Sequence, residues 1–391
     1  MKRTLMFFVA CLGSLALSGC EMASSDSGAV DYHQANIDAR TALLQAANDD
    51  DPMTRTHAME AIGQTLGRGQ GELLEQGLDD PNVMARFAAA MSLGDIRYAP
   101  AKGRLEQLIL NEKTDQRVVC AAIYALYRMG DTRYAGQLGS MLTSDFPLGR
   151  GTAAMIMGKM AEPSAMGPLK ALLEEEHDPG VRFNIVEALS GLGDKKSQRI
   201  LESYAKGYYL DMRLVAIPAL SKANPNTQPI LQNMLKNDQP PRVRVAAAGA
   251  MGKLGLGDKA CFNICVQAVT LPKKMLQAGY GQAGKIKPLD VSSLRRLGAI
   301  SLGNLGQAEA IGYLRPLLYG DDGSVQVAAA MGILKIVGPT EHQRDDDELD
   351  EDGRGKGGRG EDGLDEDDQG EQDLRPIKRG PKLQTSGGLD E

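Results

Sequence analysis

Residues Asp238 to Asp258 read DQPPRVRVAAAGAMGKLGLGD, and this stretch carries the signals of one complete amphipathic helix. Asp238 can cap the first turn, and the two prolines that follow suit a turn that needs no intrahelical N–H partner. Small and aliphatic residues recur at three- and four-residue steps from Val243 to Leu254, which makes one apolar stripe. Gly255 favours an end to the helix directly after the stripe.

The stripe predicts which positions of this helix are packed. We expect Ala247 where two helices approach closely and Leu254 between its own helix pair and the neighbouring pairs. Gly252 and Lys253 fall on the opposite side of the helix, so we expect larger polar residues to be tolerated there.

The same frame recurs along the chain at a position that we call the Arg slot, defined by Arg244 in this stretch. Successive slots are 31, 33, 31, 32, 31, 31, 51 and 31 residues apart, and an Asp precedes each within six residues. A fixed period of this size, sustained nine times, indicates a repeat architecture. The slots are Arg55, Arg86, Val119, Arg150, Arg182, Arg213, Arg244, Arg295 and Gln326.

A second helical pattern, with Leu, Ile and Met on its apolar face, lies ahead of each slot helix, and no stretch alternates with period two. We therefore predict an all-α solenoid of about nine helix pairs over residues 31–340. Alanine-rich faces let helix axes approach at about 8–10 Å, so nine stacked pairs would form a rod or arc on the order of 80 Å long.

The N-terminus, MKRTLMFFVACLGSLALSGC, has a positive start and a short apolar core. Its last four residues, Leu17 to Cys20, resemble the lipobox of bacterial lipoproteins. The resemblance implies a signal peptide over 1–19, lipid on Cys20 and a tether over 20–30. Stable anchoring then follows from several acyl chains together. A plain secretory signal or an uncleaved anchor is the alternative.

The repeat resembles the HEAT-like family, in particular the short bacterial type named after phycobilisome lyases. The pattern is Asp, Val-Arg, Ala-Ala and Ala-Leu-Gly, seen at Val181-Arg182 and Val243-Arg244. The resemblance implies that the second helices line the concave face and that Asp and Arg tie neighbouring repeats together in a ladder, such as Asp145 with Arg150 and Asp178 with Arg182. A ligand-facing basic stripe is the alternative. The ladder residues are Asp51, Arg55, Arg86, Asp145, Arg150, Asp178, Arg182, Arg213, Arg244 and Arg295.

An insertion at 271–290 accounts for the one long interval between slots. Proline lies near both of its ends and glycine within it, so it reads as an exposed basic loop. Insertions in repeat arrays often lie on a binding face, although a solvated loop without a partner is the simpler interpretation. Its candidate contact residues are Lys273, Lys274, Lys285 and Lys287.

Residues 341–391 contain 18 acidic against 8 basic side chains, and this composition favours a disordered mixed-charge tail. No window of the tail has the alternating Asp, the Gly and the final Glu of a calcium loop. Loose association with divalent ions is left open.

No catalytic constellation is found. The chain has four His and no His-Glu dipeptide, the metal-binding pattern of the HEAT-repeat hydroxylases, and neither a phosphate loop nor a nucleophile elbow. We expect no cofactor and no metal. Cys261 and Cys265 share a helix face, and we interpret them with Cys120 as small buried hydrophobes. A redox or metal pair is the alternative.

These features favour a non-enzymatic, monomeric scaffold, anchored by lipid to the inner or outer membrane of a bacterial envelope and facing the periplasm or the exterior. It would present a concave surface to an unknown protein partner. The alternative is a phycobilin-lyase-like enzyme or accessory factor that handles a chromophore or carrier protein. The export signal and the net charge of −7 disfavour a nucleic-acid role.

Overall fold

The computed structural model describes residues 31–223, 227–237, 240–271 and 288–338. The chain separates into two units, and all described residues belong to the first, Met1–Asp347. Within this part of the chain every regular element is a helix, as the sequence predicts.

The described residues form nine antiparallel helix pairs, each with an outer and an inner helix. The outer helices are α1 (Tyr32–Ala46), α3 (Gly71–Gln76), α5 (Lys102–Leu110), α7 (Gln137–Met141), α9 (Met166–Glu175), α11 (Lys195–Lys206), α13 (Gln228–Asn237), α15 (Lys259–Thr270) and α17 (Ala310–Leu314). The inner helices are α2 (Pro52–Thr65), α4 (Val83–Asp95), α6 (Gln116–Arg128), α8 (Pro147–Met160), α10 (Pro179–Gly191), α12 (Leu210–Ala223), α14 (Pro241–Lys253), α16 (Pro288–Leu305) and α18 (Gly323–Val337).

Short 3-10 segments extend or precede several outer helices. They are η1 (Gly67–Gln70), η2 (Gly77–Asp79), η3 (Ala99–Ala101), η4 (Pro163–Ala165) and η7 (Arg315–Tyr319).

Aspartates ahead of the slots begin the inner helices. Asp51, Asp178 and Asp322 each accept a hydrogen bond from a backbone N–H in the first turn, which satisfies a donor that has no intrahelical partner. The quoted stretch differs at its start: Pro240 stands before α14, and Asp238 lies outside the described residues.

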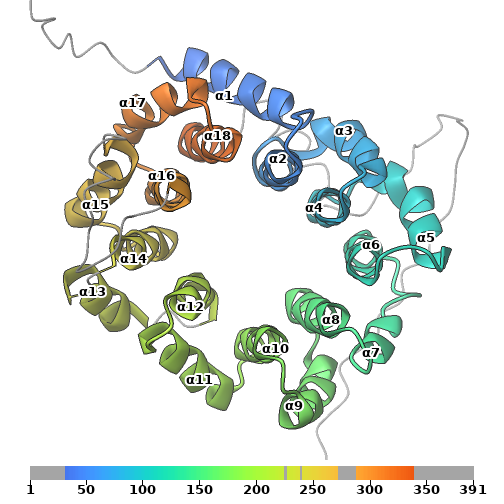
Figure 1. The fold of residues 1–391 in the computed structure, drawn as a ribbon. Coiled ribbons are helices and arrows are strands. Elements are labelled where there is room, and N and C mark those ends of the chain that lie inside the picture. Colours follow the sequence, from blue (N-terminus) through green and yellow to red (C-terminus); the bar gives the residue numbers. More distant parts are fainter. Residues whose placement is uncertain (1–30, 224–226, 238–239, 272–287, 339–391) are drawn as a thin grey trace, which may run out of the picture. The chain divides into compact units, whose positions relative to one another are not determined.

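The nine pairs close into a ring in which the inner helices surround the centre (Figure 1). The last inner helix, α18, packs against both α1 and α2. The expectation of an open rod or arc is therefore wrong, because a mean rotation of about 40° per pair brings nine pairs through a full turn. The slot helices do line the concave side, and that side encloses a lumen.

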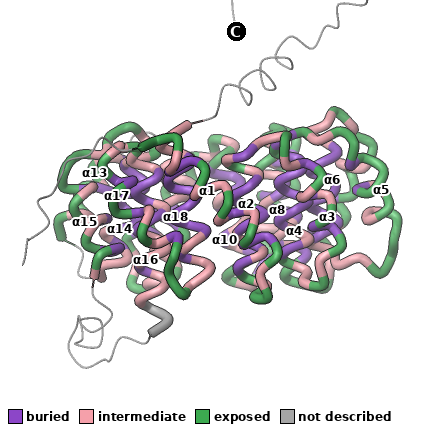
Figure 2. Tube along the Cα trace, turned by 90° about the horizontal axis from the view of Figure 1, so that it is seen from above, coloured by how far each residue is buried: buried purple, intermediate pink, exposed green. Residues whose placement is uncertain are grey.

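The core lies between the two layers of helices, whereas exposed residues follow the outer surface and the edges (Figure 2). One buried column runs through the outer helices at the repeat period, and its members are almost fully shielded from solvent. They are Leu43, Leu74, Leu105, Leu138, Leu169, Leu201, Leu231, Cys265 and Leu314. The facing inner helices supply mostly buried alanines, so the layers pack closely.

Neighbouring inner helices touch through small residues, and this corrects one sequence prediction. A Cβ on Gly252 would lie 2.8 Å from the backbone carbonyl carbon and oxygen of Asn304 in α16. Gly252 is therefore a contact position and not a tolerant one. Ala247 is fully buried as expected, whereas Leu254 is only partly buried against the core.

The seam of the ring joins the last two pairs to the first. Arg315 donates from Nε to Asp38 Oδ2 at 2.8 Å, between η7 and α1. Nη1 of Arg296 in α16 lies 2.9 Å from His57 Nε2 in α2, and since a guanidinium only donates, the imidazole nitrogen accepts. These bonds link residues 277 and 239 positions apart.

None of the described helices has the length and apolar character needed to cross a membrane.

Candidate functional site

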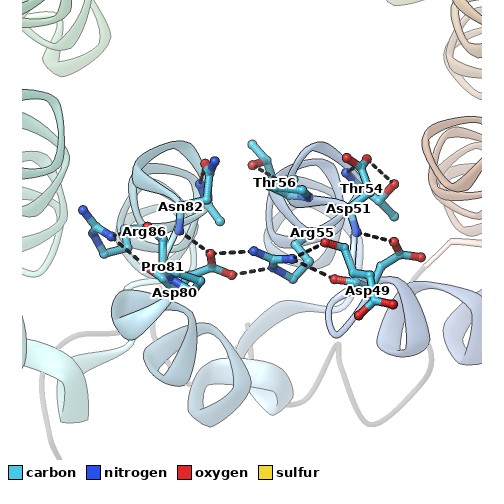
Figure 3. A network of polar contacts seen from close by, with 12 residues as sticks. Asp49, Asp51, Thr54, Arg55, Thr56, Asp80, Pro81, Asn82 and Arg86 are labelled. Carbon is cyan, nitrogen blue, oxygen red and sulfur yellow. Dashed lines mark hydrogen bonds and ion pairs between the residues drawn. The ribbon is translucent and has the colours of Figure 1, made fainter.

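Arg55 joins two neighbouring pairs at the edge of the ring where each outer helix turns into its inner helix. Its Nε donates to Asp80 Oδ2 at 2.7 Å and its Nη2 to Asp80 Oδ1 at 3.0 Å, while its Nη1 donates to the carbonyl of Asp49 in its own turn (Figure 3). The bond to Arg55 and a backbone N–H from Asn82 lower the pKa of Asp80. One guanidinium thus ties two turns together through a charge-assisted fork.

Arg150 repeats this arrangement three pairs further along, but with Glu176 as its acceptor. The two guanidinium donors lie 2.7 and 3.0 Å from the carboxylate oxygens, and Glu176 also accepts from the N–H groups of His177 and Asp178. Arg150 is the largest cause that lowers the pKa of Glu176 to about 2.

The expected pairings of Asp145 with Arg150 and of Asp178 with Arg182 are corrected by these contacts. Asp145 is exposed, and Asp178 caps α10. Asp51 likewise caps α2. Asp178 and Asp51 therefore serve their own helices, and the carboxylates that meet Arg55 and Arg150 belong to the following pair.

The other slot residues bond to backbone carbonyls of their own pair. Arg86 donates to Asp80 O, Arg182 to Glu176 O, Arg213 to Ala205 O, Arg295 to Leu271 O, and Gln326 to Gly320 O. At the Val119 slot, Arg117 instead pairs with Asp115 on the same helix. Arg244 lies in the first turn of α14. The connection before this helix includes residues 238–239, which are outside the described residues.

The position six residues before a slot decides whether a bond between pairs forms. Asp80 and Glu176 stand there, ahead of Arg86 and Arg182. In the third and sixth pairs, the position six residues before the slot holds Lys113 and Gly207, which are not acids. The arginines in the slots of the second and fifth pairs, Arg86 and Arg182, donate only to backbone carbonyls among the described residues. The sequence signal for such a bond is therefore an Asp or Glu six residues before the slot of one pair, together with an Arg in the slot of the preceding pair. We call each of these bonds a rung.

The lumen holds a cavity of about 530 Å³ lined by side chains of α2, α4, α8, α10 and α12. Lys159 is the basic group of its wall. Its Nζ lies 2.9 Å from Asp95 Oδ2 and 4.6 Å from the centre of the Tyr124 ring. Tyr124 also donates to Asp95, and burial and this neighbour raise its pKa. The inner helices thus provide a partly open cavity with one paired lysine on its wall.

Large apolar side chains gather instead at one edge of the ring, where the outer helices turn into the inner ones. Tyr208 and Tyr209, between α11 and α12, are 95% and 75% exposed, and Phe146 and Leu148, at the start of α8, are 68% and 67% exposed. We call these four residues the aromatic edge. The chain has only 11 Tyr, 6 Phe and no Trp, so placing three aromatic residues here in water is informative. The sequence signal was aromatic residues in turns, outside the apolar stripe.

The three described cysteines are free and buried. Cys265 occupies the place of a core leucine in the outer-helix column, and burial raises its pKa and that of Cys120 to about 12. Such thiols are poor nucleophiles and metal ligands. Among the described residues, no group of three His, Cys, Asp or Glu side chains could hold a metal ion.

Four groups of predicted residues lie outside the described residues. They are Cys20 with its signal and tether, the insertion lysines Lys273, Lys274, Lys285 and Lys287, Asp238, and the acidic tail.

A family model described as HEAT repeats matches residues 71–146 and 135–221. No curated protein matches the sequence. Among solved structures, human deoxyhypusine hydroxylase in complex with glycerol is 16% identical, with a TM-score of 0.33, over 70% of this chain and 97% of that chain. YibA of Escherichia coli is 17% identical, with a TM-score of 0.26, over 80% and 97%. Residues 71–221 of the chain are thus HEAT-like repeats.

Proposed function

We propose that this protein is a binding scaffold that docks a protein partner on the aromatic edge. The observation that carries the proposal is the exposure of Tyr208, Tyr209, Phe146 and Leu148 at the outer-to-inner turns of the fourth and sixth helix pairs. Aromatic residues are enriched at protein interfaces, and tyrosine is enriched among the few residues that carry most of the binding energy.

We propose further that the scaffold is monomeric and held at a bacterial envelope membrane by lipid on Cys20. The lipobox-like string at Leu17–Cys20 and the spacing to α1 support this. Mass spectrometry of the mature N-terminus is the test, with a diacylglycerol-modified Cys20 as the expected product. A free Cys20, or a mature chain that starts elsewhere, would exclude the anchor.

A catalytic role of the phycobilin-lyase type is the less supported alternative. The lumen cavity has the size of a small-molecule site, but its lining offers no cysteine or histidine among the described residues, and its Lys159 is already paired with Asp95. We therefore propose that the chain binds and does not catalyse.

A photo-cross-linking amino acid at position 209 tests the scaffold in intact cells. We expect a discrete adduct with one partner, and we expect the Tyr208→Ser, Phe146→Ser variant to lose it. The matched control carries the cross-linker at position 32, where Tyr32 is 45% exposed at the opposite edge. Equal adducts from both positions, or none from position 209, would remove the proposal.

A further inference from the structure

Acidic side chains surround the aromatic edge and have no ion-pair partner among the described residues. Asp145 precedes Phe146, Asp211 follows Tyr209 by two positions, and Glu174 and Glu175 end α9 between them. All four are exposed. The nearby lysine at the end of α11, Lys206, is already held by Glu202 at 3.6 Å. The edge thus combines apolar faces with exposed carboxylates, of which Asp145 also feels the charge of Arg150.

This combination restricts what can bind there. A nucleic acid or an anionic bilayer would be repelled by the carboxylates, and a purely apolar partner would strip water from them without compensation. A cationic side chain is attracted both to a carboxylate and to the face of a tyrosine ring. Long Lys and Arg side chains also bring methylene groups that cover apolar surface.

Resting on the proposed function, we infer that the partner presents a cationic segment, with Lys or Arg interleaved with apolar residues. Its cations lie against Glu174, Glu175 and Asp211, and its apolar groups lie against Tyr208, Tyr209 and Phe146. The charges steer the encounter and the aromatic residues hold the complex.

Fluorescence anisotropy with the full chain tests this inference. The probe is a fluorescein-labelled peptide of four Arg-Phe-Gly units, and the comparison peptide has Glu in place of Arg. We expect the Arg peptide to bind, with affinity that falls as salt is added. The Tyr208→Ser, Tyr209→Ser variant should weaken it about tenfold. The Glu174→Gln, Glu175→Gln, Asp211→Asn variant should weaken it less and flatten the salt dependence.

Matched controls are Tyr32→Ser and Glu309→Gln, both exposed at the opposite edge, and these should bind the probe as the unmodified chain does. Three outcomes overturn the inference: no binding of the Arg peptide, equal binding of the Glu peptide, or equal losses in the controls. Two further outcomes would also overturn the inference by assigning the surface to another occupant. Self-association in sedimentation that the Tyr208→Ser, Tyr209→Ser variant abolishes would indicate a second copy of the chain. Binding to vesicles of anionic phospholipid that the same variant abolishes would indicate a membrane.

The two experiments fail separately. Loss of the position-209 adduct would remove the scaffold, whereas an unbound Arg peptide with the adduct intact would leave a partner of different chemistry.

Discussion

The contact between the first two pairs and the seam of the ring solve the same packing problem with different chemistry. Between the first two pairs, Arg55 bridges to Asp80 and forms a rung (Figure 3). At the seam, the acid six before the slot is present as Asp49, but the preceding slot holds Gln326, which bonds only within its own turn among the described residues. The seam relies instead on buried apolar contacts, on Arg315 with Asp38, and on Arg296 with His57.

The comparison indicates that rungs connect pairs that are adjacent in the sequence, whereas closure of the ring depends on the fit of the apolar surfaces at the seam. Adjacent pairs are held near one another by a short connection, so one bidentate ion pair can fix their register. The first and last pairs must meet across the whole chain, and the loss of loop entropy is recovered from a broad apolar surface.

The largest expected effects come from cavities in the shared leucine column. Leu43→Ala, at the seam, and Leu74→Ala, in the second pair, should each lower the free energy of unfolding by about 2–5 kcal/mol. Hydrogen exchange separates them: Leu43→Ala should expose amides of both α1 and α18, and Leu74→Ala those of α3, α4 and their neighbours. Protection lost only in α1 after Leu43→Ala would mean an open arc.

Removing the cation of a rung should have the next largest effect. Arg150→Met leaves the Glu176 side chain, only 4% exposed, without its ion pair, at a cost of about 1–3 kcal/mol. The pKa of Glu176 is lowered to about 2 in the folded chain, against about 4.3 in the unfolded chain. The rung therefore contributes fully to the free energy of unfolding above about pH 4.3, and this contribution is lost as the pH falls from there to about 2. Urea titrations from pH 7 to pH 2 should show the gap between Arg150→Met and the unmodified chain closing in that window. A constant gap would contradict the role of the rung.

Glycine replacements should separate backbone contact from side-chain contact. Gly252→Ala pushes against the backbone of Asn304, so we expect a loss of about 1–3 kcal/mol. Gly323→Ala at the seam meets the Thr54 side chain and no backbone among its three nearest atoms, so its loss should be smaller. Thermal unfolding of both variants provides the measurement. Equal melting temperatures would show that inner-helix spacing is adjustable.

The smallest expected effect is a gain. Gln326→Arg supplies the missing guanidinium opposite Asp49 and should add a rung across the seam, raising stability by about 0.5–1.5 kcal/mol. Asp49→Asn in the same background should remove the gain. If Gln326→Arg stabilises the chain equally with Asn at position 49, the position rule for rungs is wrong.

Periodicity alone predicts most of this fold. The interval between slots identifies the nine pairs, because an amphipathic helix must repeat its apolar stripe. Closure was not predictable, since it depends on a few degrees of rotation per pair accumulated over the chain. The prediction for Gly252 was wrong because this residue contacts the backbone of α16, a helix that follows the insertion. The apolar stripe of α14 alone carries no information on that contact.

The candidate site was predicted less well. Of the aspartates near the slots, Asp51, Asp115, Asp178 and Asp322 cap helices, and the slot pattern does not predict Glu176, the acid that accepts from Arg150. The aromatic edge lay in turns, where sequence patterns say little about exposure. Only the folded structure shows that Tyr208 and Phe146 are both exposed to solvent on the same side of the ring.

Because α18 packs against α1 and α2, no pair of the described ring is terminal. An open repeat array needs polar caps at its two ends, and here each end covers the other. The chain could then begin at any of the nine pairs and still form the same ring. A chain opened at another connection between pairs, and joined between α18 and α1, would keep every contact described here.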